Sequence, residues 1–360
     1  MRIKRRQSRV VRIGGVRIGG SQPVAIQSMI KTRTAHIEES VRQIKELEHL
    51  GCQIIRVAVR DSVDARAIKE IKRRIRIPLV ADIHFNWRLG VEAIGCGADK
   101  IRLNPGNIYK PDEVRQIAAC ARSAKIPIRV GVNSGSVRLK NGSKLSMPEK
   151  LAKSALNYAR LLERSGFGDI VLSLKASNVR DTVEAYRKAA KLCDYPLHLG
   201  VTASGLPAKG LTKSAIALGV LLLEGIGDTI RISLTQQPQE EIRAAKSILE
   251  SLELRKFGPQ IISCPTCGRC EVDLVGIVRG LEKSLSRIRF NPKARFPEVA
   301  VMGCAVNGPG EAREADIGLA FGKTSGLFFK KGQVVKSVPY NKCAALILKE
   351  IQKSSKSIKE

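Results

Sequence analysis

The chain has 360 residues, a hydrophobic fraction of 43% and a formal net charge of +30. This length allows one large domain with a smaller one, and the composition is that of an ordinary globular protein. The most apolar run, Ala215–Gly227, is too short to cross a bilayer, and the basic N-terminus does not follow a signal-peptide pattern. We therefore expect a cytoplasmic protein. The chain has nine cysteines, an odd number. In the reducing cytoplasm this number favours metal ligands or buried thiols over a disulfide framework.

The charge comes from 63 Lys and Arg residues set against 33 Asp and Glu residues. A solvated, lysine-rich surface explains much of it, and an anionic substrate, an acidic protein partner or a nucleic acid are the functional interpretations. Binding of RNA usually adds aromatic side chains among the basic ones, and aromatic residues make up only 4% of this chain. The composition therefore favours a small anion or an acidic partner over nucleic acid.

The chain begins with a Gly-punctuated repeat, Arg9–Gly20, which predicts a hairpin that closes the floor of a barrel within residues 1–22. Short β-branched runs then alternate with amphipathic stretches such as Glu38–Leu50, Pro111–Ala124 and Met147–Gly166. The predicted strands are Val24–Met29, Ile54–Val59, Leu79–His84, Lys100–Asn104, Ile128–Asn133, Ile170–Lys175, Leu197–Thr202 and Thr229–Leu234. Eight regular strand–helix units favour an α/β fold of the (β/α)8 TIM-barrel type over residues 23–256, with a doubly wound sheet as the alternative.

The regular alternation of strand and helix patterns ends near Phe257–Pro259. Residues 257–360 follow the order strand, helix, strand, strand, hairpin, helix, which is typical of a smaller α+β domain and not of another barrel unit. The cysteine-rich stretch SCPTCGRC lies at the start of this domain.

Polar and charged residues lie toward the carboxyl ends of the predicted barrel strands, where the active sites of such barrels are found. They are Arg56, Asp82, His84, Arg102, Asn104, Arg129, Asn133, Lys175, Thr202, Arg231 and Ser233. Five of them are cations from five strands, and Asp82 is the one acidic residue of the set. Burying unpaired cations is costly, so this pattern predicts a bound polyanion such as a diphosphate. The neighbouring Asp82 and His84 are interpreted as a proton-donor pair or as polar anchors.

Three cysteines of SCPTCGRC, Cys264, Cys267 and Cys270, have the spacing of metal ligands. A zinc site would need a second pair, and a ferredoxin run would need a fourth cysteine soon afterwards; neither follows. A further cysteine, Cys304, lies in the Gly-rich stretch GCAVNGPGE, which ends in Glu311. The residues alone leave Cys264, Cys267 and Cys304 with either Cys270 or Glu311 as the fourth ligand.

The motifs CPTCGR and GCAVNGPGE, after a barrel containing VADIHF, RLNPGN, RVGVN, SLKAS and GIGDTIRISL, resemble the bacterial 4-hydroxy-3-methylbut-2-enyl diphosphate synthase family. The resemblance runs from about residue 11 into the 330s. It implies an iron–sulfur oxidoreductase of the methylerythritol phosphate route to isoprenoids. Such an enzyme opens and dehydroxylates 2-C-methyl-D-erythritol 2,4-cyclodiphosphate with two electrons from flavodoxin or ferredoxin.

The resemblance also assigns residues. It implies a [4Fe-4S] cluster held by Cys264, Cys267, Cys304 and Glu311, with Cys270 as a bystander. It places the substrate contacts on nine of the strand-end residues: Arg56, Arg102, Asn104, Arg129, Asn133, Lys175, Thr202, Arg231 and Ser233. It implies a homodimer, in which the C-terminal domain of one chain covers the barrel of the other. The competing hypothesis is a basic nucleic-acid-binding or phosphate-binding barrel protein with a structural zinc site.

Two stretches depart from the family pattern. After the seventh strand the family reads Thr-Glu-Ala-Gly, whereas this chain has Thr202-Ala203-Ser204-Gly205. The acidic side chain is absent, so its role in proton transfer does not carry over, and His84, Asp82 or water is expected to replace it. After Met29 the chain reads IKTRTAH, where the family prefers Thr-Asn-Thr-x-Thr.

Overall fold

The computed structural model describes residues 3–137, 144–202, 205–285, 288, 296–304, 310 and 312–356. These residues form two compact units, Met1–Arg255 and Lys256–Glu360, each with its own hydrophobic core. Glu311, Ala203 and Ser204 lie outside the described residues.

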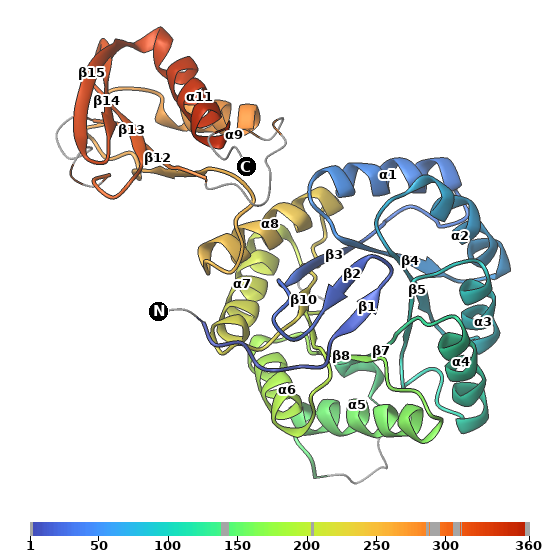
Figure 1. Cartoon of the computed structure of the whole chain (residues 1–360). Helices are drawn as coiled ribbons and strands as arrows, with labels where there is room; N and C mark the ends of the chain where they lie inside the picture. The colour runs from blue at the N-terminus through green and yellow to red at the C-terminus, as the bar shows by residue number, and fades with distance from the viewer. Residues whose placement is uncertain are drawn as a thin grey trace. The chain divides into compact units, whose positions relative to one another are not determined.

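The first unit is built on eight parallel strands, whose neighbours follow the order β8-β7-β6-β5-β4-β3-β10-β9. The strands are β3 (Ala25–Met29), β4 (Ile54–Val59), β5 (Leu79–Ile83), β6 (Lys100–Leu103), β7 (Ile128–Asn133), β8 (Ile170–Lys175), β9 (His198–Leu199) and β10 (Thr229–Ile230). A parallel bridge between Leu172 of β8 and Leu197, just before β9, joins the two ends of this sheet. The predicted (β/α)8 barrel is confirmed, and the doubly wound alternative is wrong (Figure 1).

Helices follow the strands and surround the barrel in Figure 1. They are α1 (Ile37–His49), α2 (Ser62–Arg74), α3 (Trp87–Gly95), α4 (Pro111–Ser123), α5 (Met147–Arg164), α6 (Val179–Leu192), α7 (Pro207–Leu223) and α8 (Pro238–Ser251), with a short 3-10 turn, η1, at Ser134–Ser136. Their starts follow the sequence closely: Asp61, Asn86 and Asn178 accept hydrogen bonds from the first turns of α2, α3 and α6. These three helices therefore begin a few residues after a strand has ended at the barrel mouth.

The last two barrel strands are shorter than the predicted Leu197–Thr202 and Thr229–Leu234. Beyond β10, the N–H of Leu234 donates to Glu241 Oε1 at 3.0 Å instead of joining the ladder. Beyond β9, Gly200 lies so close to Lys175 and to the carbonyl of Arg231 that an added Cβ would stand 2.5 and 2.8 Å from them. Single backbone hydrogen bonds continue past these strands, from Arg231 to Leu199 and from Thr202 to Ala176, but regular ladder pairing ends there.

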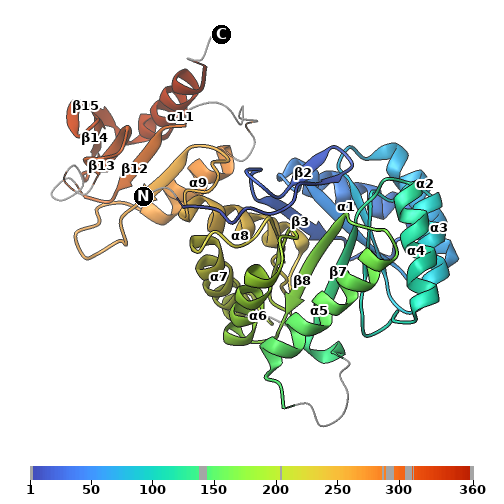
Figure 2. The same cartoon turned by 60° about the horizontal axis from the view of Figure 1, so that its bottom comes forward.

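The N-terminal repeat forms a hairpin of β1 (Val11–Ile13) and β2 (Val16–Ile18). Its apolar side chains share a core cluster with residues in the first half of barrel strands, among them Ala25, Ile54 and Val80. The hairpin therefore packs against the amino-terminal end of the barrel, opposite the end where the strand-terminal charges lie (Figure 2).

The second unit is a mixed sheet in the order β11-β12-β13-β14-β15, parallel over its first three strands and antiparallel over its last three. The elements are β11 (Gln260–Ser263), α9 (Leu274–Leu285), β12 (Glu298–Met302), β13 (Ile317–Phe321), β14 (Ser325–Lys330), β15 (Gln333–Pro339) and α11 (Tyr340–Lys356). Buried residues of α9 and α11 share one core cluster with β12 and β13. This confirms the predicted smaller α+β fold.

Among the described helices, none combines the length and the apolar character that crossing a membrane would require.

Asp228 ties the N-terminal segment to the barrel and generates a stability prediction. It is 2% exposed and accepts hydrogen bonds from Arg5, Ser8 and the N–H of Leu197 at 2.7–3.0 Å. Asp228→Ala removes the acceptor of all three hydrogen bonds and the buried carboxylate paired with Arg5, so we expect it to lower the free energy of unfolding by about 3 kcal/mol. Urea unfolding followed by circular dichroism measures this. Asp112→Ala, at a carboxylate exposed on α4, is the control and should change little; an equal effect of both substitutions would contradict the role of Asp228.

Candidate active site

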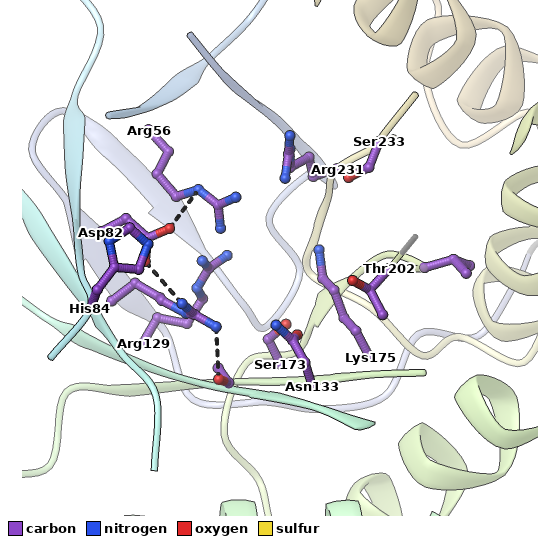
Figure 3. Close-up of a pocket in the computed structure, with 13 residues that line it drawn as sticks. Arg56, Asp82, His84, Arg129, Asn133, Ser173, Lys175, Thr202, Arg231 and Ser233 are labelled. Atoms are coloured by element: carbon purple, nitrogen blue, oxygen red, sulfur yellow. Dashed lines mark hydrogen bonds and ion pairs between the residues drawn. The ribbon is translucent and has the colours of Figure 1, made fainter. Parts of the chain in front are cut away.

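The carboxyl ends of the barrel strands enclose a cavity of about 240 Å³ with charged walls. Figure 3 shows how the side chains from different strands point into this space. The cavity is lined by Arg56, Asp82, His84, Arg102, Arg129, Gly131, Asn133, Ser173, Lys175, Val201, Thr202, Arg231 and Ser233. Ten of the eleven predicted strand-end residues are in this lining. Asn104 is not: its side-chain amide donates to Ser136 at 3.0 Å and its oxygen accepts from the N–H of Gly106, so it shapes the loop after β6.

Strand register explains why the charges meet. Asp82 of β5 pairs with Arg102 of β6, and Arg102 pairs with Arg129 of β7, so three charged residues stand side by side at one level of the barrel. Like charges directly opposite each other destabilise a sheet, so the Arg102–Arg129 pair needs an anion. The carboxylate of Asp82 supplies part of it, because Arg102 Nη1 donates to Asp82 Oδ1 at 3.1 Å.

Asp82 is the anionic centre of the cavity. Its second oxygen lies 3.6 Å from Nε of Arg56, so one carboxylate contacts two guanidinium groups. Burial by itself would raise the pKa of Asp82, but Arg56, Arg102 and Arg129 outweigh it and hold the pKa at about 2. Asp82 is therefore ionised at neutral pH, which suits an anchor for arginines better than a proton donor.

Arg129 and Lys175 lie in the cavity without a carboxylate at ion-pair distance among the described residues. Arg129 is 1% exposed, and its Nε and Nη1 have no hydrogen-bond partner among the described residues. Burial, together with Arg102 and Arg231, lowers the pKa of Arg129 to about 9, although Asp82 opposes them. Donors of this kind, enclosed and aimed into a cavity, suit an anionic ligand with several acceptor oxygens.

A second carboxylate, Glu241 at the start of α8, lies behind Arg231. Its Oε2 is 3.9 Å from Arg231 Nη2 and 3.4 Å from the Ser28 hydroxyl, while its Oε1 accepts the N–H of Leu234 and lies 3.7 Å from Lys31 Nζ. Glu241 is 2% exposed. It therefore joins the loop after β3 to the loop after β10 and holds Arg231 at the edge of the cavity.

Sequence reasoning missed three lining residues: Gly131, Ser173 and Val201. Ser173 could have been found, because it precedes Lys175 by two residues on β8 and so shares its face. Gly131 carries a weaker signal. Its carbonyl accepts from Arg102 Nη2 at 3.0 Å, and an added Cβ would stand 2.6 Å from Arg102 Nε, so only glycine leaves room for that guanidinium.

The predicted cysteine ligands lie at one edge of the second sheet. Cys264 directly follows β11, and Cys304 comes two residues after β12, which runs parallel to β11 in register. The N–H of Gly303 donates to Cys264 Sγ at 3.3 Å. Cys267 is exposed and Cys304 is partly exposed, as accessible ligands would be. Within the described part of the chain, no three side chains of the His, Cys, Asp and Glu type are gathered closely enough to hold an ion.

Gly303 is packed among thiols. A Cβ on this residue would stand 2.5 Å from Cys270 Sγ and 3.5 Å from Cys264 Sγ. The predicted ligands in the described residues are all cysteine thiols, and the N–H of Gly303 already donates to one of their sulfurs. Soft sulfur ligands with such backbone hydrogen bonds fit the chemistry of an iron–sulfur cluster. Glu311, the predicted fourth ligand, lies outside the described residues.

The fold and the cavity define an enzyme class: a TIM-type barrel with a cationic active-site mouth, joined to a second domain with free cysteines near the ends of its parallel strands. Family models match both parts, the GcpE TIM-barrel domain over residues 8–246 and the GcpE protein C-terminal domain over residues 260–353. The chain belongs to the GcpE family.

Curated relatives agree over nearly the whole length. The protein from Fusobacterium nucleatum is 50% identical over 92% of this chain and 93% of its own, and the one from Caldanaerobacter subterraneus is 50% identical over 98% of both. Both are named 4-hydroxy-3-methylbut-2-en-1-yl diphosphate synthase (flavodoxin). The predicted family resemblance and the interpretation as an enzyme are confirmed, and a nucleic-acid-binding or zinc-containing barrel protein is not favoured.

Solved structures support the fold alone. A dihydropteroate synthase from Stenotrophomonas maltophilia gives a TM-score of 0.52 at 13% identity, covering 68% of this chain and 98% of that one. The dihydropteroate synthase from Coxiella burnetii gives 0.51 at 16% identity, covering 69% and 100%. The part of this chain that these structures cover, 68% and 69% of its length, is about the size of the barrel unit, Met1–Arg255.

The contact of Glu241 with Arg231 generates a prediction. Glu241→Gln keeps the shape but removes the charge, so Arg231 should lose its fixed position and anion binding should weaken by about tenfold, the equivalent of roughly 1.4 kcal/mol. Titration calorimetry with inorganic diphosphate measures this. Glu240→Gln is the matched control on the same helix, because Glu240 pairs with Arg243 on the exposed face. Equal affinities of both variants would show that Glu241 does not act through Arg231.

Proposed function

We propose that this chain catalyses the reductive ring opening and dehydroxylation of 2-C-methyl-D-erythritol 2,4-cyclodiphosphate to 4-hydroxy-3-methylbut-2-enyl diphosphate, in isoprenoid biosynthesis by the methylerythritol phosphate pathway. The observation that carries the proposal is the cavity in which five cations from five strands face one carboxylate, Asp82. In a family whose relatives are named for a diphosphate product, this excess of positive charge matches a diphosphate ligand.

The cavity residues then take distinct roles in binding. Arg56 and Arg102, already fixed by Asp82, offer their remaining N–H groups to phosphate oxygens, and Arg129, Lys175 and Arg231 complete the cationic wall. The uncharged Asn133, Thr202 and Ser233 supply further donors, and Asn104 supports the site through its loop. The position of these side chains around one cavity supports the assignments.

Proton transfer falls to His84 in this proposal. It lines the cavity and is only partly buried, whereas the low pKa of Asp82 keeps that carboxylate ionised. Asp82 would orient the arginines and hold positive charge close to His84. The acidic residue that the family has at position 203 is Ala203 here, so the imidazole of His84 or a water in the mouth must serve instead.

Cys264, Cys267, Cys304 and Glu311 would hold the [4Fe-4S] cluster in the second domain. When bound, it supplies electrons one at a time and an iron that can polarise a substrate oxygen. The protein contributes three thiolates, an exchangeable carboxylate at Glu311 and the N–H of Gly303, which stabilises negative charge on Cys264.

Flavodoxin, or ferredoxin, is the proposed electron donor. The relatives are named flavodoxin-dependent, and a net charge of +30 would attract an acidic carrier. We also propose a cytoplasmic homodimer, because the thiols and the diphosphate cavity belong to different units of the chain and must meet for the reaction.

The ligand assignment predicts a difference between neighbouring cysteines. Anaerobically purified protein should be brown, with broad absorption near about 400 nm and about four irons per chain. Cys264→Ala should lose most of this iron, because three ligands hold the cluster poorly, whereas Cys270→Ala should keep it. Iron analysis and the absorption spectrum measure the effect. Colourless protein with one zinc, or loss of iron in the Cys270 variant, would contradict the assignment.

Glu311 has a different expected signature. Glu311→Ala should reduce turnover of the cyclic diphosphate by at least about tenfold while iron content falls much less, because three thiolates still bind and only the exchangeable ligand is gone. Activity with chemically reduced flavodoxin is compared with iron content in the same preparation. Unchanged turnover would show that Glu311 is not the fourth ligand.

The homodimer is tested by light scattering on the active protein. A mass of two chains is expected, since the proposed reaction needs both units together. A fully active monomer would contradict this part of the proposal.

A further inference from the structure

Beneath the anion cavity the barrel encloses a second layer of buried polar residues that the proposed function does not use. Lys100 and His198 are both fully buried. Lys100 Nζ has Gln27 Oε1 at 3.5 Å, and His198 Nε2 lies 3.5 Å from Lys175 Nζ. On its other side, His198 Nδ1 is 2.7 Å from the hydroxyl of Thr229. Lys175 therefore links the cavity above to a buried imidazole below.

The charges of this region are out of balance before any ligand binds. The enclosed cations are Arg56, Lys100, Arg102, Arg129, Lys175 and Arg231, and the carboxylates in ion-pair contact with any of them are Asp82 and Glu241. Within the described part of the chain, Lys100, Arg129 and Lys175 make no ion pair. The least costly way to relieve such repulsion is to release a proton from a lysine, since arginine holds its proton far more tightly.

Lys175 is the lysine that faces the ligand. Burial, followed by repulsion from Arg231, Arg129, Arg56 and Arg102, lowers its pKa well below the usual value. No carboxylate contacts it among the described residues, and Gly200 packs so closely that an added Cβ would stand 2.5 Å from its Nζ. Lys100 is shifted in the same direction by burial, Arg129 and Arg56, but it does not line the cavity.

His198 can accommodate either form of Lys175. Its pKa is lowered by burial and by Arg129, Lys175, Lys100 and Arg56, so the ring stays neutral. A neutral ring with its proton on Nδ1 donates to Thr229 and accepts from a lysine ammonium at Nε2. With the proton on Nε2, it donates to a neutral amine while the Thr229 hydroxyl rotates to donate to Nδ1. The backbone carbonyl of His198 accepts from Tyr186, which holds the ring's strand in place.

We propose that binding of the cyclic diphosphate is coupled to the uptake of one proton by Lys175, with His198 as the positioning residue that supports both protonation states. This inference rests on the proposed function, because the ligand's negative charge is what draws the proton in. The charged and titratable groups that line the cavity with Lys175 are Arg56, Asp82, His84, Arg102, Arg129 and Arg231, and His198 lies against its ammonium from below.

The direction of the pH dependence follows. In the free protein the pKa of Lys175 is depressed, and a bound dianion raises it. Between these two values binding takes up a proton, so affinity falls as pH rises, by up to about tenfold per pH unit for one full proton. At a pH below the pKa of Lys175 in the free protein, the lysine is already charged, so the affinity no longer depends on pH.

Titration calorimetry of the full-length, anaerobically purified chain tests this. The cyclic diphosphate itself is the probe, because each of its phosphorus atoms carries a single strongly acidic group and the ligand does not titrate near neutrality. Binding heats in HEPES and in Tris at one pH differ in proportion to the protons taken up. The expected result is uptake approaching one proton per chain, together with the fall in affinity described above.

Two variants locate the proton. Lys175→Arg keeps the charge permanently, so it should bind the ligand with no proton uptake and a flat pH profile. His198→Asn should still bind, with its uptake displaced to a different pH. Lys188→Arg, at a lysine that pairs with Glu149 on the outside of the barrel, is the control and should behave like the unsubstituted chain.

The outcomes separate the two proposals. Binding with equal heats in both buffers and a flat pH profile would overturn the proton coupling and leave the proposed function standing. Undiminished uptake in the Lys175→Arg variant would overturn the assignment to Lys175. A chain that does not bind the cyclic diphosphate at all would overturn the proposed function, and the proton coupling with it.

Discussion

The mouth of the barrel depends on one constraint: more positive charge is enclosed there than the carboxylates of the described residues neutralise. Burying a cation without a partner costs several kcal/mol, so the unliganded site is held in an unfavourable state by the rest of the barrel. Strands with near-continuous apolar packing on their outer faces, and a hairpin sealing the opposite end, supply the stability that makes this tolerable. An arriving polyanion then meets donors that are already desolvated and oriented, so little reorganisation is needed on binding.

Two carboxylates decide how this charge is distributed. Asp82 stands at the level of Arg102 and Arg129 and divides its oxygens between Arg102 and Arg56, which leaves Arg129 free for the ligand. Glu241 belongs to a helix start instead of a strand, and it fixes Arg231 together with the backbone of the following loop. Each carboxylate orients an arginine but does not neutralise all the cations of the cavity. The arginines are therefore held in place, and the cavity still attracts an anion.

Much of this could be predicted from sequence because strand geometry is regular. The residue spacing in β4, β6, β7 and β8 placed Arg56, Arg102, Arg129 and Lys175 on the inner face, and ten of the eleven predicted residues line the cavity. Asn104 follows the same spacing yet turns into its own loop, where hydrogen bonds to Ser136 and Gly106 compete with the cavity. Local polar contacts of this kind have no periodic signature.

Glu241 and His198 could not be predicted for other reasons. Glu241 lies in the first turn of a helix, where acidic residues are common for their interaction with the helix dipole, so its sequence position does not distinguish it. His198 comes early in its strand, away from the strand ends at the barrel mouth; only the packing of β8 beside β9 brings its ring to Lys175. Both act through contacts between different elements of the barrel, which a pattern of neighbouring residues does not encode.

The same excess of charge acts on the ligand and on Lys175. Burial and repulsion from the neighbouring arginines lower the pKa of this lysine, and those arginines are also the groups that attract an anion. A site of this composition gains its negative charge from the ligand, so attraction for the ligand and the depressed pKa of Lys175 have one physical origin. In the proposed coupling, the proton that Lys175 lacks in the free site is drawn in together with the ligand.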